Sequence, residues 1–281
     1  MRYVAPARRV WTRYVAIGDS FTEGMSDPDP SHPGAYVGWA DRLAHHLDAI
    51  AEREHLPFGY ANLAVRGRKL DDVVGPQLDA ALRMTPDLVS MVGGGNDLLR
   101  PSVDLDGLAS RLEEAVVRIR QTGADVLLAT PTDTRDAGLF KALRGRHAVH
   151  TANLFTIAQR NGCHVVNLWG MPALRDWRMW SEDRIHLTAE GHRRVALSAL
   201  TALGHNTDFA DWTTPLPPAD RAARREELRG HAEWVRVHAT PWLQRRMRGE
   251  SSGDRVLAKR PRLVHFRDPA GEPAHQPLPE G

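Results

Sequence analysis

A serine near the N-terminus has the setting of a nucleophile. Ser20 follows Gly18 and Asp19 directly after a run of aliphatic residues, and Gly24 lies just beyond it. At the C-terminal end of a parallel strand, a serine hydroxyl projects into the crevice where open α/β sheets bind ligands, with free backbone N–H groups nearby. Ser20 is therefore a candidate nucleophile. Taken alone, a Gly-Asp-Ser tripeptide favours the simpler interpretation of a helix N-cap or a turn.

An acid and an imidazole stand three residues apart in the second half of the chain, at Asp183 and His186. Within one tight turn the carboxylate can hold one ring N–H, which fixes the tautomer and leaves the other nitrogen to take a serine proton. His186 is thus a candidate general base and Asp183 its orienting acid. By itself this spacing is equally compatible with an exposed pair of little energetic consequence.

Two further segments offer hydrogen-bond donors for an oxyanion. Residues 93–97 read Gly-Gly-Gly-Asn-Asp, whose glycines allow close approach of the backbone and whose Asn96 amide can stabilise developing negative charge. Gly67 can present its backbone N–H to the same oxygen. Asp19 and Asp97 are expected to support the two loops by accepting backbone N–H bonds. Each glycine is also compatible with an ordinary turn.

The elements that position these segments are short aliphatic runs that alternate with longer helical patterns. Strands are predicted at residues 13–17, 60–65, 88–92, 126–130 and 164–168. Helical spacing of apolar residues is found at about 39–50, 104–121, 140–160 and 189–203. Because helices between strands supply the crossovers of a parallel sheet, the pattern predicts the α/β class.

The four chemical segments fall at the ends of the first three predicted strands and just after the fifth. The carboxyl ends of parallel strands share one edge of the sheet, where α/β proteins place their ligands. Four unrelated turns would not be expected to bring a nucleophile, two donors and a base to this edge. The coincidence favours a nucleophilic site over four independent turns.

With these segments in this order, the chain resembles the GDSL, or SGNH, hydrolase family over about residues 13–203. The four blocks of the family are similar to Gly18-Asp19-Ser20, Gly67, Gly94-Gly95-Asn96-Asp97 and Asp183 to His186. The resemblance implies a flavodoxin-like three-layer α/β/α sandwich with a mainly parallel five-stranded sheet. It implies ester hydrolysis through an acyl-serine, with no cofactor and no metal.

The resemblance also implies the role of each site residue. Ser20 would be the nucleophile, His186 the base and Asp183 its orienting acid. The oxyanion hole would consist of the N–H groups of Ser20 and Gly67 with the side chain of Asn96. The substrate would be a small or medium acyl ester, including an acetylated carbohydrate. An acyltransferase or a thioesterase would use the same acyl-serine, so these alternatives stay open.

Length and composition exclude several other classes. The 281 residues, 42% hydrophobic and 26% charged, are typical of a globular protein. A single cysteine excludes an internal disulfide framework and a multi-cysteine metal site. The pairs His45/His46 and His147/His150 lack partners at ligand spacing, so solvated helix faces are expected there. No apolar stretch is long enough for a signal-peptide core or a membrane span, so a cytoplasmic protein is expected.

The C-terminal quarter differs from the rest in charge and proline content. Residues 1–211 are expected to form the α/β domain, 212–218 a linker, 219–248 a basic helical extension and 249–281 a Pro-rich tail without regular structure. The extension holds eight Arg against four acidic residues. This charge is small beside the many phosphate contacts of nucleic-acid-binding proteins, so packing on the α/β domain is preferred to binding of nucleic acid or another anionic polymer. The sequence indicates no oligomeric state.

Three remaining features of the sequence are not expected to take part in the reaction itself. Trp169, Trp177 and Trp180 precede the base and are expected to be core aromatics rather than pocket lining. The segment 23–38, rich in Pro, Gly, Asp and Ser, is a candidate lid over the crevice. Ser251 lies in a G-x-S-x-G string without the strand and helix that this motif requires, so it is not expected to be a nucleophile.

Overall fold

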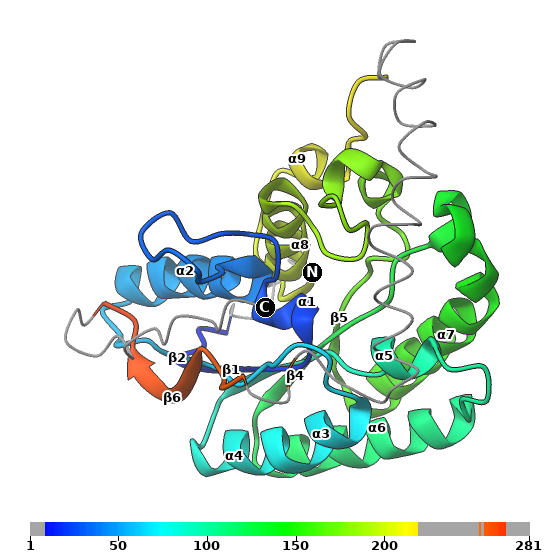
Figure 1. The fold of residues 1–281 in the computed structure, drawn as a ribbon. Helices are drawn as coiled ribbons and strands as arrows, with labels where there is room; N and C mark the ends of the chain where they lie inside the picture. The colour runs from blue at the N-terminus through cyan, green and yellow to red at the C-terminus, as the bar shows by residue number, and fades with distance from the viewer. Residues whose placement is uncertain (1–8, 219–252, 254–255, 268–281) are drawn as a thin grey trace, which may run out of the picture.

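One central sheet organises the protein (Figure 1). The computed structural model describes residues 9–218, 253 and 256–267. The strands are β1 (Arg13–Ile17), β2 (Gly59–Asn62), β3 (Leu88–Met91), β4 (Asp125–Ala129), β5 (His164–Val166) and β6 (Arg260–His265). Their order across the sheet is β5-β4-β3-β1-β2-β6, with β6 antiparallel to β2 and the other pairs parallel. The predicted α/β class with a mainly parallel sheet is confirmed.

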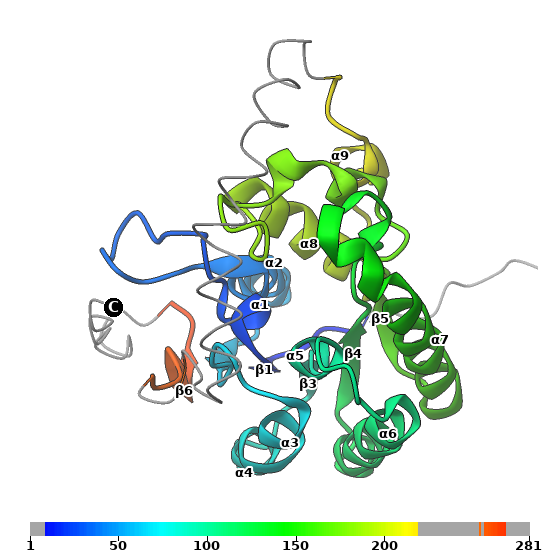
Figure 2. The same cartoon turned by 45° about the vertical axis from the view of Figure 1, so that its right-hand side comes forward.

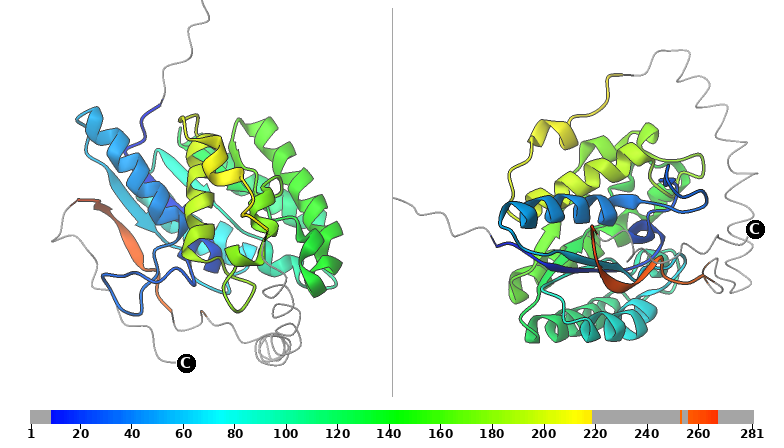
Figure 3. Two further views of the ribbon diagram at one scale, coloured as in Figure 1. Left: turned by 90° about the horizontal axis from the view of Figure 1, so that it is seen from above. Right: turned by 90° about the vertical axis from the view of Figure 1, so that its left-hand side faces the viewer.

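Helices cover both faces of the sheet, which gives three layers (Figures 1 and 3). They are α1 (Ser20–Glu23), α2 (Gly38–Arg53), α3 (Leu70–Asp72), α4 (Leu78–Arg83), α5 (Gly95–Leu98), α6 (Leu105–Gln121), α7 (Arg144–Asn161), α8 (Ala189–Ala202) and α9 (Phe209–Thr213). On one face α2 packs against α8, and on the other α6 packs against α7 (Figure 2). Among the described residues, no helix is both long and apolar enough to cross a membrane.

The alternation of side chains along β1 explains the two-sided core. Tyr14 and Ala16 are fully buried in the cluster beneath α2 and α8. Val15 and Ile17 are fully buried in the second cluster, beneath α4, α6 and α7. Successive side chains of a strand point to opposite faces, so a strand with helices on both sides is apolar at every position. This is why the strand reads as a continuous aliphatic run in the sequence.

The sheet has six strands rather than the expected five, and the tail from 249 was wrongly expected to lack regular structure throughout. Strand β6 pairs with β2 at the edge of the sheet. An edge strand is bonded on one side only, so it tolerates Pro261, which argued against a strand in the sequence. Phe266 then packs its ring edge against Phe58 and Tyr60. The predicted extension 219–248 and the Ser251 string lie outside the described residues.

Lys259, just before β6, joins this C-terminal segment to the N-terminal part of the fold. Its Nζ donates to the backbone oxygens of Glu23 (2.6 Å), Tyr36 (3.0 Å) and Val37 (2.5 Å). It also pairs with the carboxylate of Asp41 at 2.5 Å, and both side chains are about nine-tenths buried. A buried ammonium with four acceptors holds the end of α1 and the start of α2 together.

Replacement of this cation is expected to destabilise the fold. In Lys259→Met the buried Asp41 carboxylate loses its closest partner and three carbonyls lose a donor, so the free energy of unfolding should fall by about 3 kcal/mol. Urea unfolding at pH 7 measures the change. Arg262→Met, at an exposed position of the same strand, is the control and should change stability by less than about 0.5 kcal/mol. Equal effects of the two substitutions would contradict the anchoring role.

Candidate active site

Ser20 is the first residue of α1, directly beyond the C-terminal end of β1. Asp19 caps this short helix, because its Oδ1 accepts a hydrogen bond from the Phe21 N–H at 3.1 Å. A Cβ atom at Gly18 would come within 2.6 Å of Thr22 Oγ1 and 2.9 Å of the Val92 oxygen, so only glycine fits there. The Gly-Asp-Ser sequence therefore makes both a tight turn and an N-cap, with the serine at the strand edge.

Asp183 and His186 form a close pair in the loop before α8. His186 Nδ1 lies 2.6 Å from Asp183 Oδ2. The other carboxylate oxygen, Oδ1, accepts from Ser181 Oγ at 2.7 Å and from the N–H groups of Ile185 and His186 at 2.9 and 3.0 Å. Burial raises the pKa of Asp183, but the hydrogen bond and charge of His186 outweigh it and hold this pKa well below its usual range. The carboxylate is thus ionised and oriented toward the ring.

Asn96 lies in α5, immediately after β3 and the glycine run. Its Nδ2 donates to the Arg68 oxygen at 2.9 Å and is 3.4 Å from Asp19 Oδ2. Asp97 Oδ2 accepts from the Leu70 N–H at 2.9 Å, which ties this loop to the start of α3. The Asn96 amide is therefore fixed beside the cap of the Ser20 helix.

Gly67 sits in a turn after β2, with a φ of 73°, in the left-handed region that favours glycine. The preceding residue, Arg66, donates from its backbone N–H to Glu23 Oε2 at 2.6 Å, and its guanidinium pairs with the same carboxylate. Glu23 is in α1, so this buried ion pair connects the Gly67 turn to the Ser20 helix. Sequence reasoning missed the pair, since nothing in the spacing of Glu23 and Arg66 indicates it.

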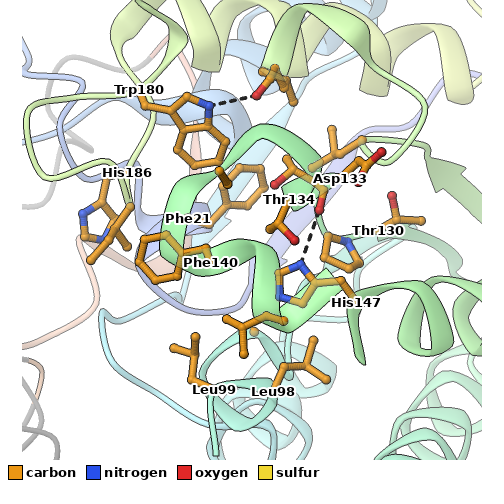
Figure 4. A pocket seen from close by; sticks show the side chains of 18 of the residues that line it. Phe21, Leu98, Leu99, Thr130, Asp133, Thr134, Phe140, His147, Trp180 and His186 are labelled. Carbon is orange, nitrogen blue, oxygen red and sulfur yellow. Dashed lines mark hydrogen bonds between the residues drawn. The ribbon is translucent and has the colours of Figure 1, made fainter. Parts of the chain in front are cut away.

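A cavity of about 240 Å³ brings three of the candidate residues together: Ser20, Asn96 and His186 all line it (Figure 4). Asp183 is set behind His186, and Gly67 is not part of the lining. The other lining includes nine large apolar side chains: Phe21, Leu98, Leu99, Phe140, Leu143, Leu168, Leu174, Trp177 and Trp180. Ser20 and His186 form no hydrogen bond with each other among the described residues, and such contacts are commonly long in ligand-free enzymes.

Two expectations about the surroundings of the site are wrong. Trp177 and Trp180 line the cavity, whereas they were expected to be core aromatics rather than pocket lining. Trp180 also packs against the core cluster beneath α2 and α8, and its Nε1 donates to the Leu174 oxygen at 2.9 Å. The candidate lid, 23–38, contributes no lining residue, because Lys259 and Asp27 fix it beside α2. Instead, the segment between β4 and α7 walls the cavity. The sequence pattern did not predict this wall, because its position depends on tertiary packing.

The His147/His150 pair was expected on a solvated helix face, and this is also wrong. Both rings line the cavity, and His150 is 3% exposed. Burial lowers the pKa of His150 to about 4, although a hydrogen bond to the Gly93 backbone opposes this shift. The neutral ring of His150 thus supports the glycine run before Asn96. No cluster of three or more metal-ligating side chains is present in the described part of the chain.

The buried carboxyl of Asp19 gives stability an unusual pH dependence. Burial raises its pKa from 3.8 to about 6, against hydrogen bonding from Phe21 and the nearby charge of His186. Between these values the native state binds more protons than the unfolded state, so this group makes stability fall as pH rises from about 4 to 6. The penalty above pH 6 is on the order of 2–3 kcal/mol.

Asp19→Asn should remove this penalty, because the amide oxygen can still cap α1 and carries no charge. The difference in free energy of unfolding between variant and wild type is expected to move in favour of the variant by about 2–3 kcal/mol from pH 4 to pH 7. Chemical denaturation across this range measures it. A difference that does not change with pH would contradict the raised pKa of Asp19.

Comparison with known proteins agrees with this fold. A serine, an amide and an Asp–His pair at the strand ends of an α/β sheet define the class of SGNH-type ester hydrolases. The chain belongs to the GDSL-like lipase/acylhydrolase family, whose model matches residues 16–194. It is therefore an enzyme that hydrolyses ester bonds. No curated protein matches the chain.

Several solved structures are similar. LAE5, an α/β hydrolase enzyme from the metagenome of Lake Arreo in Spain, is 25% identical over 69% of this chain and 95% of its own, with a TM-score of 0.57. TesA is 21% identical over 68% of this chain and 97% of its own, with a TM-score of 0.54. Axe2, an acetylxylan esterase from Geobacillus stearothermophilus, is 19% identical over 69% and 95%, with a TM-score of 0.56. The similarities to TesA and Axe2 show a shared fold alone.

Proposed function

We propose that this protein is a serine esterase that hydrolyses small or medium acyl esters through an acyl-serine intermediate, with no metal or cofactor. The observation that carries the proposal is the convergence of Ser20, Asn96 and the Asp183-supported His186 on one cavity. The apolar side chains of that cavity support an acyl group as the part of the substrate that it holds. Its volume of about 240 Å³ supports a short to medium chain.

In this mechanism Ser20 Oγ attacks the ester carbonyl carbon while His186 Nε2 takes the hydroxyl proton. Asp183 stabilises the imidazolium that forms, because its carboxylate already holds Nδ1–H. The Ser20 N–H and the Asn96 amide donate to the oxyanion. The Gly67 N–H, on the turn outside the lining that the Glu23–Arg66 pair holds to the Ser20 helix, is the third donor of this proposal. His186 then protonates the leaving alcohol, and the acyl-serine remains. A water molecule, deprotonated by His186, attacks this intermediate and releases the acid.

The test is hydrolysis of p-nitrophenyl esters from acetate to palmitate by the wild type and Asn96→Ala. The wild type should be most active on a short or medium ester, and Asn96→Ala should lose roughly 10²–10³ in kcat as an oxyanion donor is removed. An optimum at palmitate would contradict the proposed chain length. Unchanged kcat in the variant would contradict the role of Asn96.

Transfer to an alcohol and cleavage of a thioester remain the alternative outcomes, since they proceed through the same acyl-serine. Product analysis with an added alcohol acceptor separates them. Ester formation that outpaces hydrolysis would replace the esterase proposal by an acyltransferase, and faster cleavage of acyl thioesters than of matched esters would replace it by a thioesterase.

A further inference from the structure

The cavity has a polar side that no step of the proposed reaction uses. Figure 4 shows His186 on one side of the lining and Asp133, Thr134 and His147 on the other, with Phe140 between them. Asp133 and Thr134 follow the end of β4, and His147 projects from the first turn of α7. The wall opposite the candidate base is therefore built from side chains that can bind a polar group.

The protonation of His147 is defined by its surroundings. Its Nδ1 lies 3.3 Å from the backbone oxygen of Thr132. A carbonyl can only accept, so Nδ1 carries the hydrogen and Nε2 carries a lone pair. Burial lowers the pKa of His147 despite this hydrogen bond, and the ring is neutral at pH 7.

The second nitrogen of this ring is an acceptor available to a ligand. Among the described residues Nε2 of His147 forms no hydrogen bond, and the ring is one of the side chains that line the cavity. Figure 4 shows Nδ1 bonded to the carbonyl and the other nitrogen on the side that faces Phe140. An alkyl chain placed against Nε2 would remove this acceptor from water without supplying a donor, which is unfavourable.

The lone pair of His147 Nε2, rather than the neighbouring charge, argues against a carboxylate as the ligand group. Asp133 is 6% exposed, and the hydrogen bond from Arg144, at 2.7 Å, helps to hold its pKa below the usual range. Arg135 and Arg175 also pair with this carboxylate, at 3.6 and 3.4 Å, so three guanidinium groups offset its charge. A ligand carboxylate at His147 would meet the lone pair of Nε2 without a hydrogen to donate to it. A hydroxyl group has the hydrogen that Nε2 can accept.

We propose that His147 Nε2 accepts a hydrogen bond from a hydroxyl group on the part of the ester seated in the cavity, so that the enzyme prefers hydroxylated esters to matched alkyl esters. This inference rests on the proposed esterase function. It names His147 as a specificity-determining residue, and it narrows the substrate class from acyl esters in general to esters that carry a hydroxyl on the part seated in the cavity.

The experiment compares kcat/KM for two matched pairs of substrates. One pair is p-nitrophenyl 3-hydroxybutyrate and p-nitrophenyl butyrate, with the hydroxyl in the acyl part. The other pair is glycerol monobutyrate and propyl butyrate, with the hydroxyls in the alcohol part. A neutral hydrogen bond is expected to favour the hydroxylated member of at least one pair by roughly 3- to 10-fold.

Three variants test whether His147 causes the preference for the hydroxylated ester. His147→Phe should bring the ratio within the pair to about 1, whereas His147→Gln, which keeps an acceptor, should retain part of it. His265→Phe is the matched control, at an exposed position of β6 away from the cavity, and should keep the wild-type ratio. Thermal unfolding of each variant checks that it is folded, and the ratio is independent of the active fraction of enzyme.

The outcomes separate this inference from the proposed function. A wild type that hydrolyses these esters through Ser20 but shows no preference in either pair would overturn the inference and leave the esterase proposal intact. The inference also fails if His147→Phe keeps the wild-type ratio. Loss of the ratio in His147→Phe, with its retention in His265→Phe, is the result that supports it. No hydrolysis of any of the four esters would contradict the proposed function and the inference together.

Discussion

Ser20→Ala is expected to abolish ester hydrolysis, with a fall in kcat on the order of 10⁴–10⁶-fold. The substitution removes the atom that would form the bond to the acyl carbon, so no other part of the site can compensate. The fold should be unaffected, since Asp19 still caps α1 through its side chain and alanine is well accommodated in a helix. Release of p-nitrophenol measures the change.

The covalent intermediate provides a second measurement of the same variant. Wild-type enzyme, quenched in acid during turnover, should carry one acyl group on the peptide that contains Ser20, and Ser20→Ala should carry none. Ser251→Ala is the control, because its G-x-S-x-G string satisfies a nucleophile motif in the sequence. Full activity in Ser20→Ala, or a large loss in Ser251→Ala, would show that the nucleophile has been assigned to the wrong serine.

The arrangement of the candidate site follows from local sequence together with one rule of topology. Each of the segments around Ser20, Gly67 and Asn96 comes directly after a strand that the aliphatic runs predict. Parallel strands end at the same edge, so identifying the strands was enough to bring these loops together. The Asp183–His186 contact is local as well, since the two residues are three positions apart in one tight turn.

What the sequence did not predict depends on contacts between distant segments. Lys259 donates hydrogen bonds to Glu23 and Asp41, which are more than 200 residues away in the chain. No periodic pattern in the sequence predicts such a pairing. Strand β6 was missed because proline usually excludes a strand, and its tolerance at an edge is known only once the neighbours are known. Local patterns therefore defined the elements, whereas the anchoring of the C-terminal segment required the tertiary structure.

The histidines of α7 show the same limit at the cavity. A helix with His147 and His150 among Arg and polar residues has little amphipathic contrast, so its buried side could not be chosen from sequence. The segment before α7 brings both rings to the cavity, and their neutral state then follows from burial. The sequence shows that these side chains are imidazoles, but it does not predict that they are buried at the cavity.

Asp183→Asn is expected to lower kcat on the order of 10⁴-fold, although the substituted side chain has nearly the same shape. Three donors converge on Asp183 Oδ1, from Ser181 Oγ and the N–H groups of Ile185 and His186. In the variant these donors require the amide oxygen at that position. The amide NH₂ must then take the place of Oδ2, 2.6 Å from His186 Nδ1 in the wild type.

An NH₂ group facing Nδ1 reverses the tautomer of His186, because that ring nitrogen must now accept. The hydrogen moves to Nε2, and the ring can no longer take the proton of Ser20. Nitrogen NMR of the imidazole should report Nδ1–H in the wild type and Nε2–H in Asp183→Asn. Asp208→Asn is the matched control, since Asp208 caps α9 through an equivalent backbone bond but does not line the cavity, and its kcat should equal that of the wild type. If Asp183→Asn keeps kcat within tenfold, the carboxylate does not set the tautomer of the base.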